Sequence, residues 1–217
     1  MVEGLNPILE LKLVHAVSTE NILNGSKSDF SLEDLMTALA DSSGERRPVE
    51  RWNPDFCGEI DIVIKSDGRW FHDGSEIKRQ PLVKLFASVL RKDEDGVTYL
   101  VTPVEKLAIQ VEKAHFLAVR LDAKGESEDQ RLFFTTNLGD VIEASAENMI
   151  RVETHKESGE PAPFINVWGR LEATLTRPVF YELVDLAIAR ETTKGVQYGV
   201  WGGGEFFPLG PVEALHD

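Results

Sequence analysis

Residues 96–101 read GVTYLV, and residues 195–200 read GVQYGV. Ahead of each copy lies a stretch with helical periodicity that begins with an arginine and a proline, at Arg79 in the first copy and Arg177 in the second. Ahead of those stretches come matching strand patterns that end in Gly68-Arg69 and in Gly169-Arg170. The same order of elements is kept twice. This repetition predicts a duplicated unit whose two copies pack together, and their junction is a natural place for a ligand site.

Hydrophobic periodicity indicates which elements each copy contains. Ile60, Ile62 and Ile64 recur at every second position, as in a half-buried strand, and residues 66–68 predict a hairpin turn. Pro81 suits the first turn of a helix, and the apolar stripe of that helix continues to position 90. Many short strands with one helix per unit indicate an α+β fold.

The chain divides into three expected segments. Residues 1–48 form an N-terminal extension that contains a helix capped by Ser31. Residues 49–114 form the first β-rich unit, and residues 115–217 form the second.

Composition restricts the class of partner. The 217 residues carry a formal net charge of −14, which repels nucleic-acid backbone and anionic lipid, so we expect no general nucleic-acid binding and no membrane association. The sequence shows neither a signal peptide nor an apolar run of about 20 residues. A single cysteine, Cys57, fits a reducing compartment. We therefore predict a cytoplasmic protein, whose oligomeric state the sequence leaves open.

Basic residues at the predicted helix starts are candidates for binding an anion. Lys78 and Arg79 end a strand directly before Pro81, and Arg177 takes the corresponding place in the second copy. The first N–H groups of a helix lack internal partners and attract anions, and an arginine adds a bidentate donor for phosphate or carboxylate. The alternative is that each arginine pairs with a nearby carboxylate.

Two tryptophans lie beside the Gly-Arg steps of the two copies. Trp70 follows Arg69, and Trp168 precedes Gly169-Arg170. An aromatic face next to an arginine can stack a nucleotide base or another planar group. The alternative is that both tryptophans belong to the core.

No motif specifies a reaction. His72 lies close in sequence to Asp73, Glu76 and the basic pair, so it could act as a general acid or base, or be an exposed turn histidine. The histidines and the cysteine lack the spacing of a zinc site, and neither a nucleophile elbow nor a dinucleotide or phosphate-loop motif is present. We therefore predict no metal, cofactor or catalytic residue.

Longer motifs of the chain carry a family resemblance. They are WNP (52–54), GEIDI (58–62), GRWFHDG (68–74), IKR (77–79), LFASVL (85–90), VTPVEK (101–106) and GVWGGG (199–204). Together they resemble the bacterial family called domain of unknown function 1285, over residues 49–209. The resemblance implies a duplicated β-rich architecture, a C-terminal half loosely like pleckstrin-homology folds, and a ligand site between the halves. A nucleotide-like ligand and a signalling role are suggested for that family.

These observations favour a binding module over an enzyme. We expect it to hold a small anionic, nucleotide-like molecule between its two units and to act in signal transduction. The expected ligand-binding residues are Trp70, His72, Lys78, Arg79, Trp168, Arg170 and Arg177. Two alternatives stay open: an enzyme that acts on a phosphorylated small molecule, and a scaffold that binds a protein partner through strand edges without a small ligand.

Overall fold

The protein is mostly β. The computed structural model describes residues 47–154, 159–193 and 195–211. Of these residues 52% lie in strands and 14% in helices, arranged as three sheets and two α-helices, so the predicted α+β class is wrong. The two α-helices have only eight and nine residues, too few to form a layer of their own. The predicted helix capped by Ser31 lies outside the described residues.

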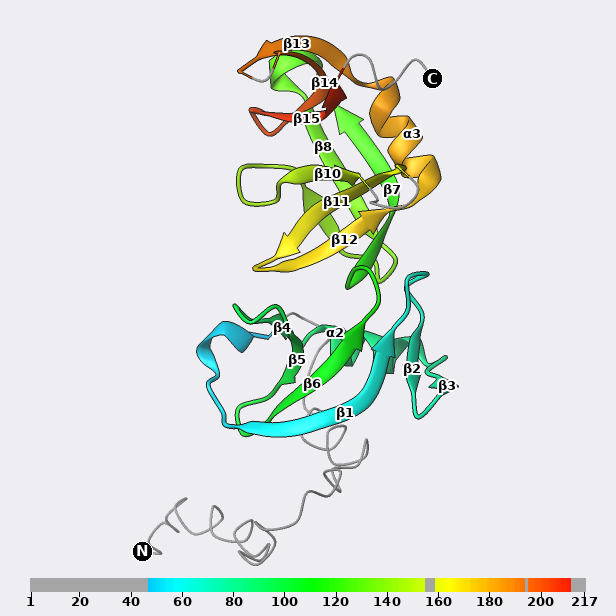
Figure 1. The fold of residues 1–217 in the computed structure, drawn as a ribbon, viewed down its shortest axis with the longest axis vertical. Coiled ribbons are helices and arrows are strands. Elements are labelled where there is room, and N and C mark those ends of the chain that lie inside the picture. The colour runs from blue at the N-terminus through cyan, green and yellow to red at the C-terminus, as the bar shows by residue number, and fades with distance from the viewer. Residues whose placement is uncertain (1–46, 155–158, 194, 212–217) are drawn as a thin grey trace, which may run out of the picture.

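The first unit is a six-stranded sheet with one α-helix (Figure 1). Its elements are a 3-10 helix η2 (Val49–Arg51), β1 (Phe56–Ile64), β2 (Trp70–His72), β3 (Ser75–Glu76), α2 (Gln80–Ala87), β4 (Leu90–Lys92), β5 (Thr98–Val101) and β6 (Lys106–Val111). The strand order is β3-β2-β1-β6-β5-β4. The central pair, β1 and β6, is parallel, and the other neighbours are antiparallel.

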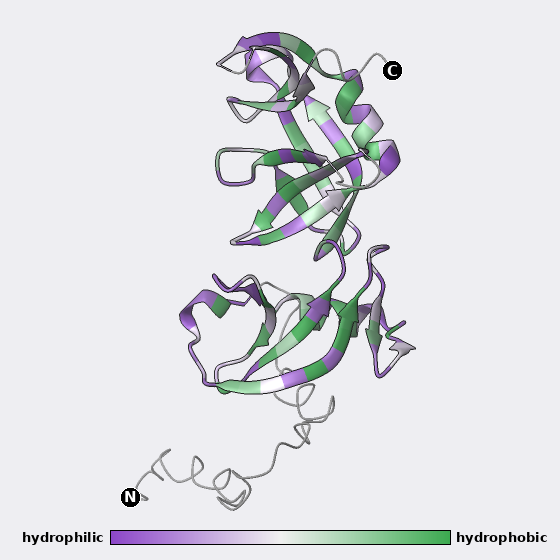
Figure 2. Ribbon diagram, viewed as in Figure 1, coloured by the Kyte–Doolittle hydropathy of each residue, from purple (hydrophilic) through white to green (hydrophobic). Residues whose placement is uncertain are grey.

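Burial in this unit follows the sequence pattern. Ile60, Ile62 and Ile64 on β1 are 8%, 0% and 0% exposed, which confirms the predicted alternation, and Figure 2 shows hydrophobic and hydrophilic residues alternating along the strand. Helix α2 has a proline in its first turn, as predicted. It buries Phe86, which stacks on the indole of Trp70 from β2 with ring centroids 6.4 Å apart.

The second unit contains two sheets. Its elements are β7 (Phe116–Lys124), a 3-10 helix η3 (Ser127–Asp129), β8 (Arg131–Thr136), β9 (Val141–Glu143), β10 (Ile150–Thr154), β11 (Pro161–Trp168), β12 (Leu171–Leu175), α3 (Arg177–Asp185), β13 (Ile188–Thr192), β14 (Gly195–Gly202) and β15 (Glu205–Pro211). One sheet has the order β10-β11-β12-β7-β8-β9, and the other is β13-β14-β15. None of the helices in the described part of the chain is long and apolar enough to cross a membrane.

The predicted duplication is confirmed. A hairpin, a helix and a three-stranded antiparallel meander follow one another as β1-β2, α2 and β4-β5-β6, and again as β11-β12, α3 and β13-β14-β15. The repeated motifs GVTYLV and GVQYGV fall at the middle strand of each meander. The copies differ in pairing. In the first copy β6 lies beside β1, whereas in the second the meander is a separate sheet and β7 lies beside β12 in parallel.

The expected loose likeness of the C-terminal half to pleckstrin-homology folds stays a prediction. Among its described residues, this half has nine strands in two sheets and one α-helix, α3, which comes between β12 and β13 in chain order.

The two units meet along a packed contact, which we call the seam. Buried apolar residues form one continuous cluster with members from both units. At one point the β1–β2 hairpin touches the second unit through Gly68, whose backbone φ is +78°. A Cβ atom added there would lie 3.0 Å from Asn137 Nδ2 and 3.0 Å from Leu117 side-chain carbons. Only glycine combines this backbone conformation with this close approach.

Replacement of Gly68 tests the packing of the seam. We expect Gly68→Ala to lower the free energy of unfolding by about 2 kcal/mol, from left-handed backbone strain and from crowding against the second unit. Gly74→Ala is the matched control, because Gly74 has a φ of +72° but no atom within 4 Å of the added Cβ. The control should lose about 1 kcal/mol in urea unfolding. Equal losses in the two variants would contradict the close contact.

Candidate functional site

A cavity of about 330 Å³ opens at the seam, and we call it the seam cavity. Its lining residues come from the η2 region and β4 of the first unit and from the β11–β12 hairpin of the second: Glu50, Trp52, Asn53, Leu90, Arg91, Lys92, Asp93, Trp168, Gly169 and Arg170. Small-molecule sites range from about 300 to 1,000 Å³, so the volume suits a small ligand.

The second-unit wall is the β11–β12 hairpin, which is held by contacts with the rest of its unit. The pairing of β11 with β12 shifts between Asn166 and Trp168, which is a β-bulge. The side-chain amide of Asn148 donates to the carbonyl oxygens of Asn166 and Val167 at 3.0 and 2.8 Å. Trp168 packs edge-to-face on the buried ring of Phe116, with centroids 5.5 Å apart. These contacts hold the Trp168 indole at the cavity.

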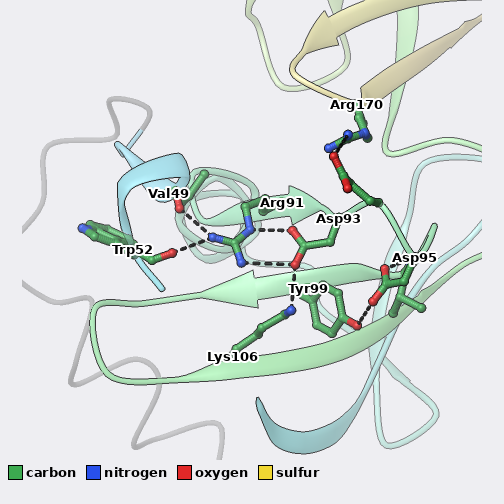
Figure 3. A network of polar contacts seen from close by, with 10 residues as sticks. Val49, Trp52, Arg91, Asp93, Asp95, Tyr99, Lys106 and Arg170 are labelled. Carbon is green, nitrogen blue, oxygen red and sulfur yellow. Dashed lines mark hydrogen bonds and ion pairs between the residues drawn. The ribbon is translucent and has the colours of Figure 1, made fainter. Parts of the chain in front are cut away.

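Arg170 extends from this hairpin toward the first unit. Its Nη2 lies 2.8 Å from Oε1 of Glu94, so this pair joins the two units. Figure 3 shows Arg170 extending from its hairpin toward the first unit. The side chains are 54% and 87% exposed, so water screens the attraction and the pair contributes little to stability. A ligand anion can therefore replace Glu94 as the partner of Arg170.

The first-unit wall depends on the guanidinium of Arg91, which donates four hydrogen bonds (Figure 3). Arg91 donates from Nε and Nη2 to the carboxylate of Asp93, at 2.6 and 3.2 Å, and from Nη1 to the carbonyl oxygens of Val49 and Trp52, at 2.9 and 2.6 Å. Lys106 Nζ adds a third cationic contact to Asp93 at 2.7 Å. Arg91 therefore has a structural role: it joins β4 to the segment that carries Trp52.

The charge of Asp93 is neutralised within this network. Burial works to raise the pKa of Asp93, but hydrogen bonds from Arg91 and Lys106 outweigh it and hold the pKa below its ordinary value. The carboxylate is thus ionised at neutral pH and is surrounded by two cations. It repels an anion in the cavity much less than an isolated carboxylate would.

The turn that carries Glu94 is fixed by its other neighbour, Asp95. The Tyr99 hydroxyl donates to Asp95 Oδ2 at 2.6 Å, and the Val97 amide donates to Oδ1 at 2.9 Å. The hydrogen bond to Asp95 raises the pKa of Tyr99 to about 12, so this phenol stays a donor. These two hydrogen bonds constrain the turn, and the side chain of Glu94 reaches Arg170 at the seam.

Lys92 is the cation of the cavity without a carboxylate partner. It is half-buried at the end of β4, opposite Thr98 on β5, and it forms no ion pair within the described residues. The lining residues comprise three bases (Arg91, Lys92 and Arg170) and two acids (Glu50 and Asp93). A chain with a net charge of −14 thus has a locally basic cavity at its seam.

A buried histidine links the two units. His115 is 4% exposed, and its Nδ1 accepts a hydrogen bond from the Glu172 amide at 3.1 Å. The proton therefore lies on Nε2, which is 3.0 Å from Thr98 Oγ1 in the first unit. Burial, with a smaller contribution from the charge of Lys92, lowers the pKa of His115 to about 4. The folded protein keeps this imidazole neutral.

The buried histidine makes stability depend on pH. Unfolded His115 takes up a proton near pH 6.5 but the folded form does so only near pH 4, so the stabilisation is complete above 6.5 and is lost as pH falls toward 4. We expect a loss on the order of 2 kcal/mol between pH 7 and pH 5. Urea unfolding of the wild type and of His115→Gln measures it. Parallel pH profiles for the two proteins would contradict the neutral buried state.

The structure brings some of the seven predicted site residues together. Trp168 and Arg170 line the seam cavity. Trp70 and Lys78 line a different cavity beside the start of α2, which we call the α2 cavity. The histidine, His72, lies at the end of β2, where its Nδ1 is 3.5 Å from Asp73 Oδ2.

The two helix-start arginines lie apart from each other in the fold. Arg79 is the exposed N-cap residue of α2, and Arg177 begins α3. Arg177 lines a cavity with Lys113 and Tyr181 that does not include Arg79. Its Nη2 lies 3.8 Å from Glu160 Oε1.

Three residues of the seam cavity region, Trp52, Lys92 and Glu94, were missed by the sequence analysis. The charge pattern of the sequence could have indicated Lys92 as a candidate. Residues 78–92 contain five basic residues and no acidic one, in a chain with 37 acidic residues. The proximity of Trp52 and Glu94 to Arg170 depends on long-range packing, and no local pattern indicates it.

Comparisons with known proteins agree with this architecture. The family models described as "Domain of unknown function (DUF1285), N-terminal domain" and "Protein of unknown function (DUF1285), C-terminal domain" match residues 47–114 and 115–209. A crystal structure of a DUF1285 family protein from Silicibacter pomeroyi DSS-3 is 43% identical in sequence. It has a TM-score of 0.78, and the alignment covers 84% of this chain and 97% of that one.

A second structure is more distant. The DUF1285 family protein from Shewanella baltica OS155 is 24% identical, with a TM-score of 0.46, over 58% of this chain and 91% of that one. A comparison with curated proteins found no match. The fold and the matched segments together define a two-unit β protein, and the chain belongs to the DUF1285 family.

Proposed function

We propose that the protein is a binding module that holds a small anionic, nucleotide-like molecule in the seam cavity and acts in signal transduction. The observation that carries this proposal is the convergence of Lys92 and Arg170, one from each unit, on a cavity of about 330 Å³. Lys92 forms no ion pair within the described residues, and Arg170 has only an exposed partner. A phosphate or carboxylate group that contacts both side chains satisfies them together.

Two tryptophans support a planar component in the ligand. Trp52 lines the cavity from the first unit and Trp168 from the second. An indole face provides a large apolar surface that stacks on a heterocyclic ring. Stacking and anion pairing at one cavity are the two requirements for binding a nucleotide.

The position of the cavity supports a signalling role. Its walls belong to different units, so a ligand that contacts both walls stabilises one angle between the units relative to others. The exposed Arg170–Glu94 pair is the contact that such a ligand exchanges. The change in angle would then be the signal that a partner detects.

Titration calorimetry with adenosine and guanosine monophosphates tests the proposal. We expect Arg170→Gln to weaken binding by roughly tenfold or more, because a charge-assisted hydrogen bond is lost. Arg177→Gln is the matched control, an exposed arginine at a different cavity, and should bind like the wild type. Equal affinities for Arg170→Gln and the wild type, or no binding of either nucleotide at millimolar concentration, would contradict this function.

Replacement of Glu94 should have the opposite effect. Glu94 competes with the ligand for Arg170, so Glu94→Gln should strengthen anion binding by up to about fivefold, as expected for removal of a weak surface ion pair. The same calorimetry measures this change, with Glu128→Gln, an exposed acidic residue of η3, as the control. A weaker affinity in Glu94→Gln would show that Glu94 contacts the ligand itself.

A further inference from the structure

The third sheet of the protein, β13-β14-β15, has one face against the core and one face outside it. Residues that are paired across neighbouring strands point to the same side of a sheet. On the inner side Val200, Phe207 and Leu209 are 0%, 5% and 7% exposed. The other side, which we call the outer face, includes Ile188, Arg190, Gln197, Trp201, Phe206 and Pro208. Figure 1 shows this sheet at the end of the second unit that lies away from the first unit.

Two aromatic rings on the outer face lie outside the hydrophobic core. Trp201 and Phe206 are direct partners on β14 and β15, with ring centroids 5.5 Å apart and an interplanar angle of 67°. Both side chains are half-buried, but neither is part of the cluster of buried and partly buried residues that forms the core. The Phe206 ring covers Gly199, where an added Cβ atom would lie 2.5 Å from the ring carbon Cζ. The two rings therefore form an aromatic platform on the outside of the sheet.

Arg190 is held on this platform. Its guanidinium carbon Cζ is 4.5 Å from the centroid of the Trp201 ring and 5.0 Å from that of the Phe206 ring. An arginine that is stacked on aromatic rings is restrained, while the N–H donors at the edge of its guanidinium stay available. None of these donors has a hydrogen-bond or ion-pair partner within the described residues. Glu191, the next residue, is paired with Val196 and so points to the opposite side of the sheet.

Arginines in the same kind of position elsewhere in the chain have a carboxylate partner. Three others lie over phenylalanine rings, and each is also ion-paired, at 2.7, 2.6 and 2.7 Å: Arg69 with Asp67, Arg131 with Glu143 and Arg151 with Glu172. In the part of the chain that the structure describes, Arg190 is the stacked arginine that lacks such a partner. This difference, in a chain with 37 acidic residues, indicates a carboxylate that another molecule supplies.

The chemistry of the outer face suits a polypeptide. The face is the open side of a three-stranded sheet, and Ile188, which is 45% exposed, extends its apolar surface. The Trp201 indole Nε1–H forms no hydrogen bond within the described residues and, unlike that of Trp70, is not buried. Tryptophan and arginine are the residues that most often anchor protein–protein contacts. Arg190 is the only charged side chain among the described strand residues of this face, so a complementary partner carries a carboxylate.

We propose that the outer face docks an acidic, apolar peptide segment of a partner protein. A carboxylate of the segment accepts hydrogen bonds from the Arg190 guanidinium, a peptide carbonyl accepts one from Trp201 Nε1, and an apolar side chain packs on Ile188 and Phe206. The net charge of −14 opposes an acidic partner at long range, but salt screens that field within about 10 Å, so contacts at the face decide the affinity. The outer face shares no residue with the seam cavity and does not depend on a ligand there.

Selection from a random peptide library displayed on phage, with the full chain as bait, tests this surface. We expect the wild type to enrich peptides in which an aspartate or glutamate lies beside apolar residues. A synthetic copy of an enriched peptide should bind Arg190→Gln roughly tenfold more weakly in titration calorimetry, since a charge-assisted hydrogen bond is lost. Arg131→Gln is the matched control and should bind like the wild type, because Arg131 is also exposed and stacked on a ring but has its own carboxylate partner.

Two-dimensional NMR of the protein labelled with 15N-tryptophan locates the peptide: the indole signal that Trp201→Phe removes should move on titration. Several outcomes would overturn the proposal. A wild type that enriches no acidic peptide beyond those enriched by Arg190→Gln removes the assigned partner. Equal affinities of Arg190→Gln and Arg131→Gln, or a Trp201 signal that stays in place at saturation, place the peptide elsewhere. A Trp201 signal that moves with protein concentration alone shows that a second copy of the chain covers the face.

Discussion

The structure depends on a neutral imidazole that is buried where the two units meet. His115 accepts a hydrogen bond from the Glu172 amide in its own unit and lies within hydrogen-bond distance of Thr98 in the other. The contact at Nδ1 requires an uncharged ring, because a protonated imidazole donates from both nitrogens and cannot accept. The close approach of Gly68 to Asn137 and Leu117 restrains a second point of the same contact. The cavities at the seam have defined shapes because these contacts fix their walls.

The charged residues at the seam determine which class of ligand it can bind. The chain as a whole is strongly acidic, so an anion is repelled at long range and must be bound by local contacts. The stretch from Lys78 to Lys92 supplies part of these contacts, because it contains no acidic residue and runs through α2 and β4. A partly buried network centred on Arg91 neutralises the carboxylate of Asp93, which follows β4. Lys92 and Arg170 then remain available to a ligand.

The sequence predicted those parts of the fold that depend on local pattern. The repeat predicted the order of strand, Gly-Arg step, strand, helix and GVTYLV or GVQYGV strand in both copies, and the spacing of Ile60, Ile62 and Ile64 predicted the buried face of β1. It did not predict β4 and β13, whose first residues were assigned to the ends of the two helices. It did not predict that β7 lies beside β12, where the first copy has a strand of the meander. The parallel pairing of two distant strands produces no recognisable pattern in the sequence of either strand. The predicted α+β class was wrong for a related reason. Helices of eight or nine residues are too short for the sequence pattern to show how small a share of the fold they form.

The candidate site was predictable to a similar extent. Trp168 and Arg170 were identified because they flank Gly169 in the repeated Gly-Arg step. In the structure Gly169 has a φ of +53° and lies at the turn between β11 and β12. Lys92 and Trp52 were not identified, since their proximity to that hairpin arises from the packing of one unit on the other. A repeated sequence predicts that two residues occupy equivalent positions in their own copies, but not that they lie close together. Arg79 and Arg177 are at the starts of separate helices, α2 and α3.

The central claim is that the seam cavity binds an anion with a planar group. A crystal structure of the protein grown with adenosine monophosphate tests this claim most directly. The account predicts electron density for the base against Trp52 or Trp168 and for the phosphate within hydrogen-bond distance of Lys92 and Arg170, with Glu94 displaced. Density at another surface, or a seam cavity that stays free of nucleotide at saturating concentration, would contradict it.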